Sequence, residues 1–376
     1  MAFEYLNKTL AARQQASLYR QRIAFERVGP RFLLRNNTQY LNFASNDYLG
    51  LGEEPITGLE NTLGASSSSL VTGYQSAHIA LENYLKSKLN YQACLLFNSG
   101  FSANASVLKS LMNEANSEIF QDKLNHASLI DGGLAANATN TRFNHNDLKH
   151  LTRRLEKSKA QHKLIVSEGV FSMDGDSAPV AELAHIAKQH NAWLMIDDAH
   201  GFGVMGNHGL GSCDDIKPEI LIITFGKACA SSGAAVLCSQ NVADYLLQFN
   251  RDYTYSTAMS PWLASATLSR LERLYSADEK RVRLKDNIAY FKTLASNHNL
   301  ALMPSNSAIQ PLVLGDSESC LALSEYLKSN GIWLTAIRPP TVPHNTARLR
   351  ITITAAHQAA DIEQLINQLV DGSKLL

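Results

Sequence analysis

The feature that most constrains the fold is a regular alternation of short apolar segments with longer mixed segments between residues 93 and 237. Strands are expected at residues 93–97, 117–121, 163–168, 193–197, 220–224 and 234–237. Helices are expected at residues 101–111, after His126, and at residues 180–190. Short apolar strands that alternate with helices are typical of βα units. The sequence therefore predicts an α/β fold with a mainly parallel sheet.

The segments on either side of this region have a different pattern. Before it, we expect a helix at residues 10–22 and an extended segment at residues 40–44. After it, we expect a long polar helix at residues 279–298, strands at residues 308–313, 333–337 and 349–353, and a helix after residue 361. We therefore predict three parts: an N-terminal helix and extended segment at 1–44, a large domain at 45–279, and a smaller α+β domain at 280–376.

The composition narrows the choice of partners. The chain has 34 Lys and Arg residues and 34 Asp and Glu residues, so its net charge is zero and nothing favours nucleic acid or an acidic membrane. The five cysteines are scattered and odd in number, which fits reduced thiols in a cytoplasm better than disulfides. The first residues contain no apolar run of the kind found in a signal peptide.

In an open parallel sheet, ligands bind at the carboxyl ends of the strands, so the residues after each strand are the candidates. The segment NSGFSAN follows Phe97 and would present backbone N–H groups at a helix start, suited to a phosphate, or would form an ordinary turn. His126 follows the next strand, and its ring could stack on a flat ligand or could be structural. Ser172, in GVFSMDGDSAP, is a possible hydroxyl donor.

The segment DDAHGFGV follows another strand and offers two chemistries. Asp197 at the strand end could accept the N–H of a protonated heterocycle, and His200 could donate to a phenolate oxygen. Alternatively, Asp197, Asp198 and His200, with Asp174, could bind a metal ion. The motif alone does not separate the two.

Lys227 lies in TFGKACASSG, among small residues and just after Thr224, whose hydroxyl could bind phosphate. A lysine at a strand end usually keeps its ammonium group in water. A desolvated lysine, however, becomes a nucleophilic amine that can form a Schiff base. Together, the strand ends offer a phosphate site, an imidazole, a carboxylate with a histidine, and an amine, which is the set that pyridoxal phosphate requires.

These segments also carry a family resemblance. LNFASNDYLGL, NSGFSAN, NHASLIDG, EGVFSMDGDSAP, DDAHGFGVMG, TFGK and TARLRITITAAH resemble the α-oxoamine synthases, which are fold-type I pyridoxal-phosphate enzymes. The resemblance covers nearly the whole chain. It implies a seven-stranded, mainly parallel sheet, with the cofactor held by the large domain at residues 45–279.

The resemblance implies roles for particular residues. Catalytic roles fall to Lys227, His126, Asp197 and His200. Further contacts with the cofactor fall to Gly100, Phe101, Ser172, Thr224 and Thr257, the last of these reaching the phosphate of a partner subunit in a homodimer. Substrate contacts fall to Arg20, His126, Arg338, Thr341 and Arg350, with Arg350 binding the amino-acid carboxylate. Lys227 would both anchor the cofactor and transfer the substrate proton.

Within this family, AIRPPTVP at residues 336–343 is similar to the members that join L-alanine to a pimeloyl thioester on the biotin pathway. The thioester could be carried by coenzyme A or by an acyl carrier protein. A sister synthase with another amino acid or acyl group, such as glycine with an acetyl donor, remains an alternative, as does the metal-dependent hydrolase.

The sequence departs from the family in two segments. Ala228, Cys229 and Ala230 follow the lysine where the family is rich in glycine, and Leu70 follows Ser66–Ser69 where the family has a basic or polar residue. We expect methyl groups in the first segment to crowd the cofactor or to stiffen a loop.

Overall fold

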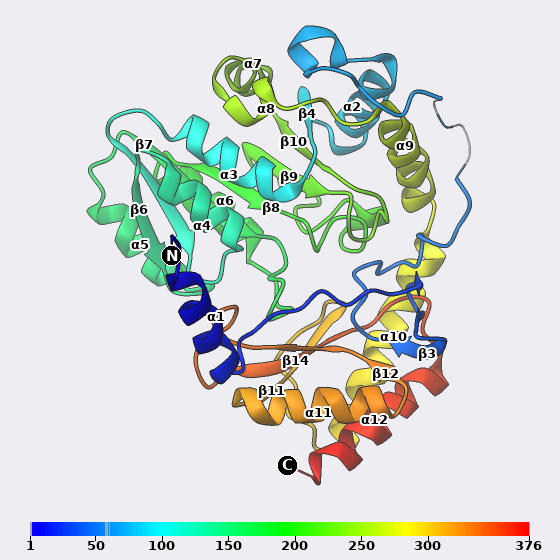
Figure 1. Ribbon diagram of the computed structural model, residues 1–376. Coiled ribbons are helices and arrows are strands. Elements are labelled where there is room, and N and C mark those ends of the chain that lie inside the picture. The colour runs from blue at the N-terminus through cyan, green and yellow to red at the C-terminus, as the bar shows by residue number, and fades with distance from the viewer. Residues whose placement is uncertain (1, 57–58, 60, 376) are drawn as a thin grey trace. The chain divides into compact units, whose positions relative to one another are not determined.

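The computed structural model describes residues 2–56, 59 and 61–375, and the chain divides into two compact units (Figure 1). The larger unit comprises Leu51–Ser172 and Asp176–Arg281, and the smaller unit comprises Met1–Gly50, Met173–Gly175 and Val282–Leu376. The three-part division at residues 44/45 and 279/280 stays a prediction.

The larger unit is built on one seven-stranded sheet of order β4-β10-β9-β8-β7-β5-β6. The strands are β4 (Ala93–Phe97), β5 (Ser117–Asp122), β6 (Thr139–Phe143), β7 (His162–Glu168), β8 (Trp193–Asp197), β9 (Ile220–Thr224) and β10 (Ala234–Cys238). β6, β5, β7, β8 and β9 pair in parallel, whereas β10 is antiparallel to both β9 and β4. The predicted, mainly parallel seven-stranded sheet is therefore confirmed.

Helices flank this sheet (Figure 1). They are α2 (Ser76–Leu89), α3 (Gly100–Leu111), α4 (Ala127–Ala135), α5 (Leu148–Lys157), α6 (Val180–Gln189), α7 (Gln240–Phe249), α8 (Arg251–Tyr255) and α9 (Pro261–Tyr275). Val107 of α3 belongs to one buried cluster with Val166 of β7 and Ile222 of β9. Burial of this apolar face holds α3 against the sheet and so fixes where the start of the helix lies.

The smaller unit contains two short sheets. One has the order β1-β2-β3-β12 and the other β11-β14-β13. The strands are β1 (Arg27–Val28), β2 (Phe32–Arg35), β3 (Thr38–Asn42), β11 (Ile309–Gly315), β12 (Ile332–Trp333), β13 (Thr335–Ile337) and β14 (Ala347–Thr352). The helices are α1 (Tyr5–Gln15), α10 (Asp278–Asn297), which begins at the end of the larger unit, α11 (Ser317–Ser329) and α12 (Ala359–Ser373).

Two expectations for the smaller unit were wrong. The helix predicted at residues 10–22 is α1, which begins at Tyr5 and ends at Gln15, because Ser17 adopts a left-handed φ of 54° that stops the helix. The single strand predicted at residues 333–337 is two strands. β12 pairs with β3, and β13 pairs with β14, so the chain passes from one sheet to the other at the buried Leu334.

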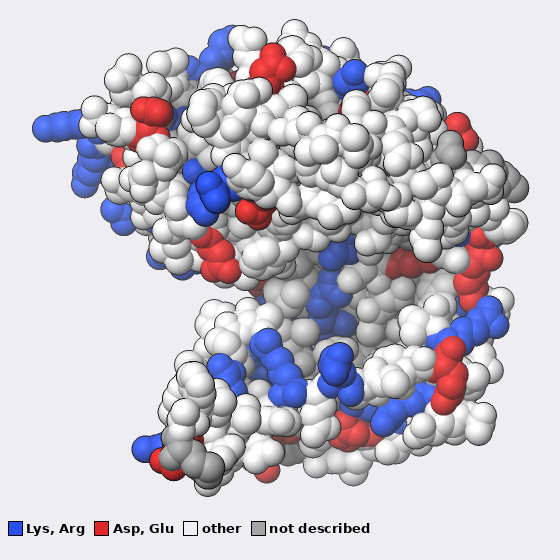
Figure 2. Space-filling view, turned by 45° about the horizontal axis from the view of Figure 1, so that its top comes forward, with Lys and Arg blue, Asp and Glu red and all other residues white. Residues whose placement is uncertain are grey.

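The surface agrees with the neutral composition. On the face shown in Figure 2, Lys and Arg side chains are interspersed with Asp and Glu among many uncharged residues. All five cysteines are buried thiols. Within the described part of the chain, no helix combines the length and apolar character needed to cross a bilayer.

A close approach of α3 and α4 sets the position of two loops that carry predicted site residues. A Cβ atom on Gly132 of α4 would lie 2.7 Å from the Cα atom and 2.9 Å from the backbone oxygen of Ala105 in α3. Real side chains do not approach backbone atoms this closely, so only glycine allows the two helices to pack at this distance.

We predict that Gly132→Ala destabilises the larger unit by about 1–3 kcal/mol, because the added methyl group forces α3 and α4 apart. Urea unfolding measures the loss. Gly64→Ala is the matched control, since a Cβ there would meet nothing within 4 Å. A Gly132→Ala protein as stable as the control variant would contradict the packing argument.

Candidate active site

A cavity of about 300 Å³ lies at the carboxyl ends of the central strands in the larger unit. It is lined by seven of the predicted site residues: Gly100, Phe101, His126, Asp197, His200, Thr224 and Lys227. They come from the segments after β4, β5, β8 and β9, which lie far apart in the sequence. Parallel strands bring their carboxyl ends to one edge of the sheet, and this explains why these segments meet.

Lys227 lies in the turn that joins β9 to β10. The backbone N–H of Phe225 donates to the carbonyl of Gly233 at 2.9 Å, and the N–H of Ala230 donates to the carbonyl of Lys227 at 2.8 Å. These bonds close the turn tightly, so the half-buried lysine side chain is held at the cavity wall. Its position is what a nucleophilic amine requires.

Asp197 ends β8 and is only 5% exposed. Its carboxylate accepts a hydrogen bond from Asn104 Nδ2 at 2.6 Å and another from the backbone N–H of Ala199 at 3.0 Å. Burial raises the pKa of Asp197, and the Asn104 hydrogen bond and the nearby Lys227 amine oppose the rise. The cavity thus contains a carboxylate that is suited to hold a cation.

His126 is the residue immediately before α4, and its side chain caps that helix. The N–H of Ser128 donates to His126 Nδ1 at 3.2 Å, and Ser128 Oγ lies 2.7 Å from the same nitrogen. The ring of Phe101 meets the imidazole edge to face at 6.3 Å. The cap and this contact fix the plane of the imidazole ring at the cavity wall.

The part of the cavity wall formed by Gly100 and Thr224 is suited to an anion. α3 begins at Gly100, where backbone N–H groups and the helix dipole favour negative charge. A Cβ on Gly100 would lie 2.5 Å from the methyl group of Thr224, so glycine leaves the backbone open. Thr224 Oγ1 is buried and has no hydrogen-bond partner among the described residues. The cavity therefore combines four features: an amine, a buried carboxylate, an imidazole and this anion site. Together they fit a flat, phosphorylated aldehyde.

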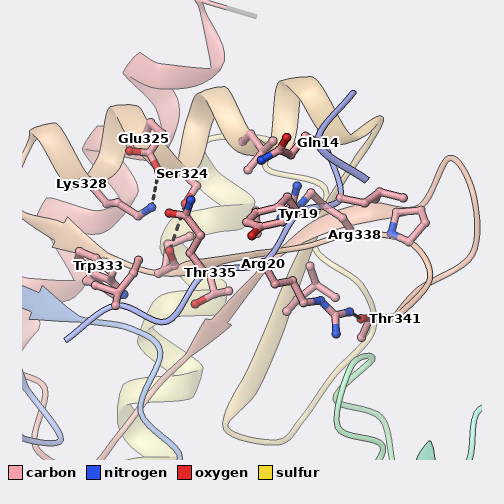
Figure 3. Close-up of a pocket in the computed structure, with 18 residues that line it drawn as sticks. Gln14, Tyr19, Arg20, Ser324, Glu325, Lys328, Trp333, Thr335, Arg338 and Thr341 are labelled. Carbon is pink, nitrogen blue, oxygen red and sulfur yellow. Dashed lines mark hydrogen bonds and ion pairs between the residues drawn. The ribbon is translucent and has the colours of Figure 1, made fainter. Parts of the chain in front are cut away.

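Four of the five predicted substrate residues, all but His126, lie in the smaller unit. Arg20, Arg338 and Thr341 line a second cavity of about 760 Å³, drawn in Figure 3. Arg20 donates to the hydroxyl of Thr341 at 2.9 Å, and Arg338 donates to the carbonyl of Ser17. The fold therefore brings three of the five predicted substrate residues together at one cavity.

The remaining predicted residues lie elsewhere. Arg350 of β14 is 8% exposed and donates to Asn46 and Thr352, each at 3.2 Å. Ser172 is buried outside the lining of the first cavity, and its backbone N–H donates to the carboxyl group of Glu168. Thr257 is exposed, and its carbonyl accepts from Asn98 at 2.9 Å.

Comparison with known proteins decides the family. The profile of the family described as aminotransferase class I and II matches residues 38–369. An 8-amino-7-oxononanoate synthase from Salmonella paratyphi B is 46% identical over 375 residues, which is 97% of this chain and 97% of that protein. The chain belongs to the aminotransferase class I and II family, among the 8-amino-7-oxononanoate synthases.

Solved structures of this family agree. The structure of SPT with PLP internal aldimine has a TM-score of 0.92 at 25% identity, and the match covers 100% of this chain and 99% of that chain. The crystal structure of 8-amino-7-oxononanoate synthase from Francisella tularensis has a TM-score of 0.75 at 28% identity, covering 89% and 98%. The predicted family, fold class and pyridoxal-phosphate dependence are confirmed.

The sequence did not point to two polar residues of the cavity wall, Glu168 and Asn104. Glu168 ends β7, is 3% exposed, and pairs in register with Asp197. Burial raises the pKa of Glu168 well above its usual range, and the Asp197 charge raises it further. Asn104 lies one helical turn after Gly100, and this spacing could have pointed to it.

The alternative metal site does not form. Within the described part of the chain, no three His, Cys, Asp or Glu side chains converge as metal ligands. Asp198 accepts hydrogen bonds from Ser212 Oγ at 2.6 Å and from its backbone N–H at 2.9 Å. Asp174 pairs with Arg348 at 2.8 Å within the smaller unit. Two of the proposed ligands are therefore engaged by protein groups.

Asp198 is fully buried in a pocket made by glycines. A Cβ on Gly169, Gly201 or Gly211 would lie 2.0–2.3 Å from its carboxylate oxygens. Burial raises the pKa of Asp198 to about 7, and the hydrogen bonds from Ser212 oppose the rise. Since the folded pKa is above the unfolded value of about 3.9, the stability that protonated Asp198 provides is lost as the pH rises towards 7.

We predict that Asp198→Asn removes this pH dependence. The asparagine can accept from the Ser212 N–H and donate to the Ser212 hydroxyl, so the packing is kept. Between pH 4.5 and 8.5, the stability of the variant should rise relative to the parent by about 3 kcal/mol. Chemical unfolding of both proteins across this range measures the difference. A difference that does not change with pH would show that Asp198 ionises normally.

Proposed function

We propose that this chain joins L-alanine to a pimeloyl thioester and forms 8-amino-7-oxononanoate. The new carbon–carbon bond joins the alanine Cα to the acyl carbonyl carbon, the thiol leaves, and the alanine carboxyl group is released as carbon dioxide. The match over 97% of both chains to a synthase of that name supports the choice of substrates. The reaction is a step in biotin synthesis.

One observation carries the proposal: Lys227 lies in the same cavity as Asp197, His126 and the start of α3. An isolated lysine on a strand end would need no such neighbours. A cofactor with an aldehyde, a basic ring nitrogen and a phosphate needs a group of this kind at each of its parts. We assign Lys227 to the aldehyde and Asp197 to the ring nitrogen. His126 stacks on the ring face.

The remaining cofactor contacts follow from position. His200 is 7% exposed and lies at the cavity wall. We assign it to the phenolic oxygen of the cofactor, to which it would donate. Gly100, Phe101 and Thr224 bind the phosphate, with Ser172 nearby. Bound pyridoxal phosphate supplies an electron sink that stabilises negative charge at the alanine Cα.

The protein's own groups handle the proton and the substrate. Lys227 takes the proton from the alanine Cα and returns one to the product, which requires its amine to be uncharged. Arg350 binds the alanine carboxylate through a guanidinium group, which matches two oxygens.

The second cavity is assigned to the acyl substrate. Arg20 and Arg338 supply positive charge, and their hydrogen bonds to Thr341 and to the Ser17 carbonyl hold them in place. In Figure 3, Arg20 extends towards Thr341 from the segment after α1. A pimeloyl chain ends in a carboxylate, and guanidinium groups are suited to bind it. The thiol carrier is coenzyme A or an acyl carrier protein.

We also propose that the enzyme is a cytoplasmic homodimer. Ser68 and Thr257 form a β-bridge, and this bridge lies next to exposed apolar side chains. Leu70, Val71 and Tyr255 are 49%, 73% and 72% exposed. Apolar groups of this size at one surface are typical of an interface. In such a dimer, Thr257 reaches the phosphate of the partner subunit.

The cofactor assignment predicts a covalent label on Lys227. The purified protein should absorb visible light when loaded with pyridoxal phosphate, and borohydride should then fix the cofactor to the peptide that contains Lys227. Peptide mass spectrometry locates the label. Lys217→Ala, at an exposed site in the larger unit, should label as the parent does. Labelling at another lysine, or none, would overturn the assignment.

Lys227→Ala should bind pyridoxal phosphate weakly and should fail to exchange the alanine Cα proton, because the variant lacks the base. NMR of alanine in deuterated water follows exchange. Thiol release with pimeloyl-CoA should fall by about 100-fold or more, the range typical of a lost proton-transfer group. Exchange at the parent rate would show that another group is the base. If the parent protein releases thiol equally fast with glycine or serine as the amino-acid substrate in place of alanine, a sister synthase is favoured.

A further inference from the structure

Asn104 occupies a position where its residue type is unexpected. It is the fifth residue of α3 and is 2% exposed. Asparagine is a poor former of helix interiors, and a buried amide requires hydrogen-bond partners. Its side chain also lines the cavity that contains Lys227. The partners of its amide therefore explain why asparagine is there.

The amide nitrogen of Asn104 joins two oxygens. Nδ2 lies 2.6 Å from Asp197 Oδ2 and 3.0 Å from Ser128 Oγ. An amide group carries two hydrogens, so it can donate one to each oxygen. The reversed orientation would place the amide oxygen against the carboxylate of Asp197. The contact with Asp197 therefore fixes which way the amide points.

The same logic fixes the direction of the bonds beyond Ser128. The backbone N–H of Ser128 donates to His126 Nδ1, so this nitrogen carries a lone pair. Ser128 Oγ lies 2.7 Å from the same nitrogen, and it donates its single hydrogen there when Nδ1 is the unprotonated ring nitrogen. The hydroxyl oxygen remains free to accept from Asn104, as observed.

We infer that Asn104 is a positioning residue that ties Asp197 to His126 through Ser128. One amide hydrogen orients the carboxylate, and the other orients the hydroxyl that holds the imidazole ring. The two side chains assigned to the ring nitrogen and the ring face thus move as one unit. The inference rests on the proposed function, because that function assigns Asp197 and His126 to the cofactor.

The contribution of Asn104 follows from how Asp197 is held. Its carboxylate accepts two hydrogen bonds, from Asn104 and from the N–H of Ala199. The charged or titratable groups that face it are Glu168, Asp198, His126 and Lys227. Removal of the amide changes none of these groups. The buried carboxylate then has one donor fewer, and its ionised form becomes less favourable.

The test uses Asn104→Leu, which keeps the size of the side chain and removes both donors. Pyridoxal phosphate should bind about 10- to 100-fold more weakly, the range for a lost hydrogen bond to a charged group. Carbon-13 NMR of the Asp carboxyl groups, with the Asp197 signal assigned by Asp197→Asn, should show titration at a higher pH in the cofactor-free full-length variant. Asn104→Ala is the second variant if the leucine disturbs folding.

Ser128→Ala tests the link to His126. Because both substitutions break one chain of bonds, the double variant should lose less affinity for pyridoxal phosphate than the product of the two single losses. The control is Ser110→Ala, which removes a buried hydrogen bond to Ser106 from the far end of the same helix. The control should bind the cofactor as the parent does.

The outcomes separate this inference from the proposed function. If the parent protein binds no pyridoxal phosphate, the proposed function fails, and the Asp197 titration still tests the contact with Asn104. If the parent binds the cofactor but Asn104→Leu binds it equally well and leaves the Asp197 titration unchanged, the inference is wrong. If the losses of cofactor affinity in the two single variants simply multiply in the double variant, Asn104 is not coupled to His126 through Ser128.

Discussion

The site depends on keeping one carboxylate ionised where water is excluded. The parallel register of β7 and β8 places Glu168 beside Asp197, and both are buried. Two adjacent buried carboxyl groups cannot both ionise easily, so their surroundings decide which one carries the charge. Asn104 and Lys227 favour the charge on Asp197, whereas burial raises the pKa of Glu168 well above its usual range. The raised pKa favours the neutral form of Glu168, whose carboxyl group accepts from the backbone N–H groups of His126 and Ser172.

Close packing of the backbone makes this arrangement possible. Gly100 lets α3 begin against Thr224, and Gly132 lets α4 lie against Ala105. The first contact leaves the anion site open, and the second sets the distance over which Asn104 can reach Ser128. Hydrogen bonds tolerate errors of only a few tenths of an ångström. The polar chain in the cavity is therefore a consequence of how near the two helices come.

The parts that the sequence could predict are those that depend on local pattern. Strands such as residues 93–97 and 193–197 were placed correctly because they are short, apolar and bounded by polar turns. The strand at residues 333–337 was not, since its division at Leu334 depends on pairing with two distant strands. Family motifs led to the cavity residues. The spacing from Gly100 could have pointed to Asn104, but its contact with Asp197, and the pairing of Glu168 with Asp197, appear only in the folded chain.

The residues that follow Lys227 depart from the family pattern, and they affect how the lysine is held. Ala228 and Cys229 are 1% and 0% exposed and lie outside the lining of the cavity, and the methyl group of Ala228 faces Gly203. Ala230 adopts a left-handed φ of 50°, a conformation that glycine reaches without strain. These methyl groups therefore lie outside the lining of the cavity, and crowding of the cofactor by them stays a prediction. Their effect is on the backbone of the turn, and that turn is what holds the amine of Lys227 at the cavity wall.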